Sequence, residues 1–178
     1  MKPELKFGLL SGAAVSVWLL ATSLAGFHFQ RLEVVKYSGT LSLVVLAGFI
    51  RFALKSARDR APDGALTLEQ GWRTGTLIAL VSASVSALFK VAHNHVLNPG
   101  WVEKAIAWER ARMEAQQAAP RKIERMETFL RTTNGDLFLV TFGILDTVVL
   151  GTFIALGLAA SMKRPPRGQE DGAASPPA

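Results

Sequence analysis

Residues 82–101 read SASVSALFKVAHNHVLNPGW, and this stretch indicates how the chain is built. It begins as an apolar segment of the kind that crosses a membrane, then carries Lys90 and a His-Asn-His triplet. It closes on Asn98, a favourable N-cap, and Pro99, which suits the first position of a helix because its missing N–H costs nothing there. The stretch therefore predicts a membrane helix that reaches the membrane boundary near its histidines, followed by a second helix.

The composition supports a membrane protein. Of 178 residues, 49% are hydrophobic and 19% are charged, and the charges cluster so that long uncharged runs remain. The net charge is +6, but the basic residues fall in short connections where they set topology, which argues against a nucleic-acid partner. There is no cysteine, so disulfides, thiolate metal sites and cysteine nucleophiles are excluded.

Four apolar runs are long enough to cross a hydrocarbon core, so we predict an all-α membrane protein with four transmembrane helices. They cover residues 7–27, 37–54, 74–97 and 137–162 of a domain formed by residues 1–162. Thr67 to Gln70 has the pattern of a capping box and predicts the start of the third helix. The first run also resembles a signal peptide, but its length favours a retained span.

The distribution of basic residues predicts the orientation. Lysine and arginine are frequent before the first span, after the second and after the fourth, whereas the loop between the first two spans holds only Arg31 and Lys36. The positive-inside rule then places both termini in the cytoplasm. The tail, residues 163–178, is rich in Pro, Gly, Ala and Ser and is expected to be disordered and cytoplasmic.

Residues 99–134 form a long insertion between the third and fourth spans. Apolar residues such as Trp101 and Ile106 recur at helical spacing among charges, and Pro120 predicts the start of a second helix. We expect an amphipathic helical hairpin or kinked helix outside the cytoplasm. Three roles stay open for it: a surface helix that covers the mouth of the bundle, a docking surface for a partner protein, or a substrate lid.

The order of several short features resembles a family of small bacterial inner-membrane proteins, a domain of unknown function numbered four-one-nine-nine. These features are Lys6-Phe7-Gly8, Leu68-Glu69-Gln70-Gly71 with Gly75, Ser86-Ala87-Leu88-Phe89 and Asn98-Pro99. The resemblance covers nearly the whole chain except the tail. It implies four spans with a large extracytoplasmic insertion before the last, and it brings no activity, cofactor or catalytic residue. Lys90 and Asp146 are not part of its pattern.

Small residues at four-residue spacing predict close helix packing, because packing rather than hydrophobicity drives helix association in lipid. Gly8, Gly12 and Ser16 form such a ridge on the first span. On the third span Ala79, Ala83 and Ala87 repeat the pattern, together with Ser82 and Ser86. The ridges serve either packing within one bundle or homodimerisation.

Lys90 and Asp146 are costly residues within apolar spans. A charge near the bilayer centre costs about 3 kcal/mol on insertion scales. Antiparallel spans would bring the two residues to similar depths, so we hypothesise a buried Lys90–Asp146 pair. It either holds the helices in register or forms part of a proton or ion pathway.

The three histidines, His28, His93 and His95, are all expected at the outer membrane boundary, which makes a metal or haem site conceivable. It is a weak candidate. His93 and His95 diverge on a regular helix, and no Asp or Glu lies near in sequence to complete a ligand shell. The composition and motifs therefore predict no cofactor.

The sequence favours a structural or accessory component of a bacterial envelope process, without enzymatic activity. Its expected partners are the lipid bilayer and either a second copy or another membrane protein, contacted through spans one and three or through the outer amphipathic helix. An oligomeric transporter or channel subunit that uses Lys90 and Asp146 is the alternative. A metal- or haem-binding membrane protein is the second alternative.

Overall fold

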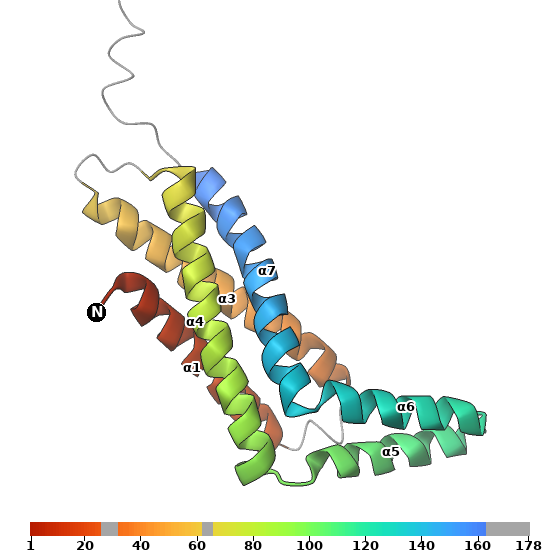
Figure 1. Ribbon diagram of the computed structural model, residues 1–178. Helices are drawn as coiled ribbons and strands as arrows, with labels where there is room; N and C mark the ends of the chain where they lie inside the picture. The colour runs from red at the N-terminus through yellow and green to blue at the C-terminus, as the bar shows by residue number, and fades with distance from the viewer. Residues whose placement is uncertain (26–31, 62–65, 163–178) are drawn as a thin grey trace, which may run out of the picture.

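The computed structural model describes residues 1–25, 32–61 and 66–162, with side chains described from Gly39 onward in the second of these ranges. All regular structure in these residues is helical, as predicted. Figure 1 shows the long helices packed side by side and the shorter ones projecting from one end of the bundle. The order is α1 (Pro3–Leu24), α3 (Leu32–Arg60), α4 (Leu68–Ala92), the π-helical turn η1 (His93–Leu97), α5 (Trp101–Ala115), α6 (Pro120–Thr133) and α7 (Asp136–Met162).

Four of these helices are long and apolar enough to cross a membrane, which confirms the predicted number. They comprise Pro3–Leu24, Gly39–Arg60, Leu68–Leu97 and Asp136–Met162. The third begins at the predicted capping box, in which the Thr67 hydroxyl accepts from the Gln70 N–H at 3.1 Å and the Thr67 N–H donates to the Gln70 side chain. The predicted disordered tail and His28 lie outside the described residues.

The central helix is α4, which packs against α1, α3 and α7. It contacts α1 through the predicted ridge. A Cβ atom added at Gly8 would stand 2.6 Å from the Cβ of Val81, and one at Gly12 would stand 2.6 Å from the Cβ of Val85. Four residues along α1 thus correspond to four residues along α4 in the same direction, so the two helices are parallel.

A second small-residue contact joins α4 to α7. A Cβ atom at Gly75 would stand 2.3 Å from the Cβ of Ala155, and one at Gly151 would stand 2.5 Å from the Cβ of Ala79. These pairings run in opposite directions along the two helices, so α4 and α7 are antiparallel. Leu46, Ile50 and Leu54 of α3 are buried in the core beside this contact.

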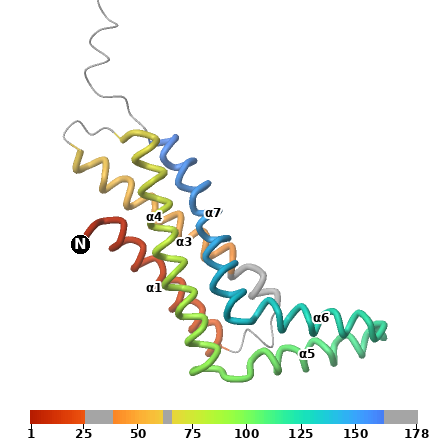
Figure 2. The backbone as a smooth tube through the Cα atoms, viewed as in Figure 1, coloured from red at the N-terminus to blue at the C-terminus, as the bar shows by residue number. Residues whose placement is uncertain are grey.

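The helix directions place the start of α1 and the end of α7 at the same end of the bundle, opposite α5 and α6 (Figures 1 and 2). The tube in Figure 2 shows α5 and α6 as an antiparallel hairpin that extends sideways beyond the outline of the bundle. The hairpin therefore projects from this end of the bundle.

The start of the hairpin differs in detail from the sequence prediction. α6 begins at Pro120 as expected, but α5 begins at Trp101, and its N-cap is Gly100 with φ at +75°. Asn98 instead ends the turn before it, because its N–H donates to the His93 carbonyl at 2.9 Å. The π-helical turn thus covers His93–Leu97, the predicted end of the third span, and the predicted N-cap Asn98 closes this turn instead of starting the new helix.

Substitution of two glycines on α7 tests the contact between α4 and α7. Gly151→Ala should destabilise the protein by about 1–3 kcal/mol, because the added methyl group overlaps Ala79 and the core cannot expand freely. Gly157→Ala is the matched control, since a Cβ there meets nothing within 4 Å. Thermal unfolding in detergent measures both; equal stabilities for the two variants would contradict the contact.

Candidate functional site

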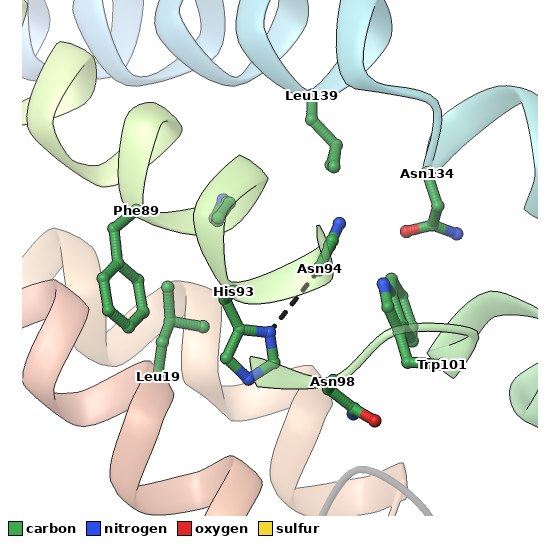
Figure 3. A pocket seen from close by; sticks show the side chains of 9 residues that line it. Leu19, Phe89, His93, Asn94, Asn98, Trp101, Asn134 and Leu139 are labelled. Atoms are coloured by element: carbon green, nitrogen blue, oxygen red, sulfur yellow. Dashed lines mark hydrogen bonds between the residues drawn. The ribbon is translucent and has the colours of Figure 1, made fainter. Parts of the chain in front are cut away.

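A cavity of about 200 Å³ lies where α4 ends, α7 begins and the hairpin is attached. Its lining combines apolar and polar side chains from four parts of the chain. They are Leu19, Phe89, Lys90, His93, Asn94, Asn98, Trp101, Asn134 and Leu139. Figure 3 shows Leu139 and Asn94 directed toward each other, with Trp101 and Asn134 beside the space between them.

The cavity exists because α4 and α7 separate toward this end. The small-residue contact holds them together from Gly71 to Ala79 on α4 and from Ala159 to Gly151 on α7. About two turns further along α7, a Cβ added at Gly143 would meet nothing within 4 Å. The larger side chains of Phe89, Lys90 and Leu139 occupy the widened end without filling it.

Lys90 is partly buried in the cavity wall, and Asp146 lies on an exposed part of α7. The Asp146 carboxylate is close enough to interact with the Lys90 ammonium through its charge, but the two form no direct ion pair among the described residues. The register explains this separation. Ala79 of α4 lies opposite Gly151 of α7, and the same antiparallel register places Ser84 opposite Asp146. Lys90 is six residues beyond Ser84, which corresponds to about 9 Å along α4.

The predicted buried contact between Lys90 and Asp146 is thus replaced by an interaction over a longer distance. The sequence prediction assumed equal entry depths for the two helices, whereas the small-residue contact sets a different register.

His93 and His95 face different partners. The Asn94 side-chain oxygen can only accept, so the His93 Nδ1–H donates to it at 3.5 Å, and His93 Nε2 accepts from the Ser23 hydroxyl at 2.9 Å. His95 Nε2 is 2.7 Å from the Asp136 carboxylate and joins η1 to the first turn of α7. Within the part of the chain that the structure describes, no three His, Cys, Asp or Glu side chains gather as metal ligands.

The predicted packing residues lie between α1 and α4. Gly8, Gly12 and Ser16 are buried, and Ser82 donates to the hydroxyl of Ser11 at 3.0 Å. Ser86 is partly buried. The first of the two ridges is therefore occupied within one chain, which supports packing of the bundle over homodimerisation at this surface.

Sequence reasoning did not identify two features of the site. Trp101 was predicted as part of an apolar helix face, yet its indole N–H is buried and has no hydrogen-bond partner among the described residues. No small-residue ridge was predicted on the fourth span, whereas Gly151, Ala155 and Ala159 of α7 form one at four-residue spacing. Counting alanine as a small residue would have revealed that ridge.

Four apolar helices around a small-residue core, with a partly polar cavity at one end, are compatible with a multi-pass helical membrane protein. Residues 6–164 match the family described as "Protein of unknown function (DUF4199)", and the chain belongs to that family. This confirms the resemblance found in the sequence. No curated protein and no solved structure matches the chain.

A double-mutant cycle tests the interaction between Lys90 and Asp146. Combining Lys90→Met with Asp146→Asn should reveal a coupling of about 1–2 kcal/mol, the value for unit charges roughly 10 Å apart at an effective dielectric constant near 20. Thermal unfolding in detergent gives the four stabilities. A coupling near zero would contradict the interaction, and about 3–5 kcal/mol would indicate a direct buried pair.

Proposed function

We propose that the protein is a structural or accessory component of an envelope process in a bacterial inner membrane, with the α5–α6 hairpin as its contact surface. Both termini then lie in the cytoplasm and the hairpin lies outside it, in accord with the basic residues near the chain ends. The role requires no enzymatic activity and no nucleic acid.

The observation that carries this proposal is the projecting hairpin, which has its own internal support. Arg131 of α6 pairs with Glu103 of α5 through both of its terminal guanidinium nitrogens. Arg110 of α5 pairs with Glu127 of α6, so two ion pairs join the two helices. Ile106 is buried between them. Exposed ion pairs contribute little individually, but a hairpin that holds itself together without the bundle can present a surface to another molecule.

The hairpin surface carries groups suited to a protein contact. The Phe129 side chain is 63% exposed and Trp108 is 39% exposed, and aromatic residues of this kind dominate binding energy at interfaces. Arg121, Lys122 and Arg125 are exposed near the tip. We therefore expect a membrane-protein partner that offers an apolar pocket with acidic residues around it.

A transporter or channel subunit is a second candidate, favoured by the cavity at Lys90 and its charge interaction with Asp146. The small-residue contact from Gly71 to Ala79 closes α4 against α7 below this cavity, so one chain offers no evident path across the membrane. Transport would therefore require an oligomer that covers the exposed face of α7.

The orientation can be measured directly because the chain has no native cysteine. In intact cells, Ala115→Cys on the hairpin should react with a membrane-impermeant maleimide. Arg60→Cys at the other end of the bundle should react only after permeabilisation. The reverse pattern would contradict the proposed orientation.

The docking role can be tested by site-specific photocrosslinking in native membranes. A photoreactive amino acid at the exposed position Phe129 should give a discrete protein adduct, whereas the same group at the buried position Ile106 should give none. Mutation of Trp108 to Ala should reduce the Phe129 adduct severalfold without lowering the amount of inserted protein. Adducts of equal yield at both positions, or none at either, would contradict docking through the hairpin.

A further inference from the structure

The cavity between α4, α7 and the base of the hairpin has the chemistry of a binding site. Its volume of about 200 Å³ is several times the volume that one molecule occupies in liquid water, about 30 Å³. It is smaller than the 300–1,000 Å³ typical of sites that enclose a whole small molecule. The space therefore suits one polar head whose remainder lies outside.

The polar part of the lining contains hydrogen-bond donors, together with the acceptor oxygen of Asn134, whose side-chain nitrogen donates to the Leu130 carbonyl. Lys90 supplies a positive charge, and the Trp101 indole N–H is buried without an acceptor. The oxygen of Asn94 is occupied by His93, and Figure 3 shows the Asn94 nitrogen directed toward Leu139. A buried donor without a partner costs about 1–3 kcal/mol, which a ligand oxygen at this position would relieve.

No lining residue is acidic. Asp146 interacts with Lys90 through its charge, yet it lies outside the lining, deeper along the bundle. It offsets part of the Lys90 charge without occupying the space. An anionic oxygen thus meets a cation and two N–H donors there, and no carboxylate in the lining repels it.

The other part of the lining is apolar and consists of Leu19, Phe89 and Leu139. The site also lies at the end of the candidate membrane span Leu68–Leu97, which comprises α4 and η1, and at the start of the span Asp136–Met162. Polar heads and acyl chains of lipids meet at this depth of a membrane. A ligand that carries an anionic head on an apolar chain matches both halves of the lining.

We infer that this cavity binds the anionic phosphate head of a membrane lipid, with the phosphate oxygens held by Lys90, Trp101 and Asn94 and the acyl chain against Leu19, Phe89 and Leu139. This site is separate from the docking surface on the hairpin, so either assignment can fail without the other.

The experiment titrates the full-length protein in neutral detergent with three probes. Short-chain phosphatidylglycerol carries an anionic head on apolar chains, short-chain phosphatidylcholine carries the same phosphate without net charge, and inorganic phosphate has no chain. Phosphatidylglycerol should bind at least about tenfold more tightly than either of the others, because the choline cation of phosphatidylcholine is repelled by Lys90 and inorganic phosphate lacks the apolar chain. Binding should also shift the ¹⁵N indole NMR signal of Trp101. This signal can be assigned because it is missing from the spectrum of the Trp101→Phe variant.

Variants separate this site from nonspecific lipid binding. Lys90→Met should weaken phosphatidylglycerol binding at least about tenfold and Trp101→Phe severalfold, because each removes one contact to the head. Lys90→Arg keeps the charge and should retain binding within a few-fold. Lys104→Met removes an exposed hairpin cation outside the cavity and should leave the affinity unchanged. Circular dichroism and gel filtration confirm that each variant folds.

Two results would overturn the inference. If Lys90→Met, Trp101→Phe and the native protein bound phosphatidylglycerol with equal affinity, the lipid would bind somewhere other than the cavity. Inorganic phosphate that binds as tightly as phosphatidylglycerol, with the same dependence on Lys90 and Trp101, would identify a site for a free anion and exclude a lipid as its ligand.

Discussion

The close approach of α4 to its neighbours is the constraint on which the rest of the structure depends. In lipid, apolar side chains gain little by leaving their surroundings, so helices associate through packing and hydrogen bonds. Gly8 and Gly12 allow α1 to reach Val81 and Val85, and Gly75 allows α7 to reach it on another side. The Ser11–Ser82 hydrogen bond and the 3.1 Å contact between Thr76 and Thr152 add polar links to these two contacts.

The same constraint creates the cavity. Small residues on α4 and α7 face each other from Gly71 to Ala79, whereas the larger side chains of Phe89, Lys90 and Leu139 line the other end. Two straight helices in contact along one half must separate along the other when bulkier residues enter, because side-chain volume is not compressible. The polar residues at the hairpin end therefore lie in a widened space, and the position of Lys90 in it follows from the packing at the opposite end.

Sequence reasoning predicted what depends on local pattern and missed what depends on register. Apolar runs gave the number of long helices, and Thr67 to Gln70 gave the start of α4, because each signal lies within one segment. The offset between Lys90 and Asp146 depends on which small residues of α4 contact which small residues of α7. This pairing involves two separate segments, so it cannot be predicted from the residue pattern within either one. The unpartnered indole of Trp101 likewise arises only where the hairpin joins the bundle.

α7 shows why the membrane matters for this fold. It is the most apolar of the four spans, with a mean hydropathy of 2.2, yet only 6% of its apolar window is buried within the chain. Exposed apolar side chains such as Phe142 and Phe153 can contact lipid acyl chains at no cost, whereas the exposed carboxylate of Asp146 cannot. An ionised Asp146 costs about 3 kcal/mol near the bilayer centre, and a charge interaction with Lys90 of about 1–2 kcal/mol offsets only part of this. The remainder favours a second chain over this face and makes α7 the surface on which association would release the most free energy.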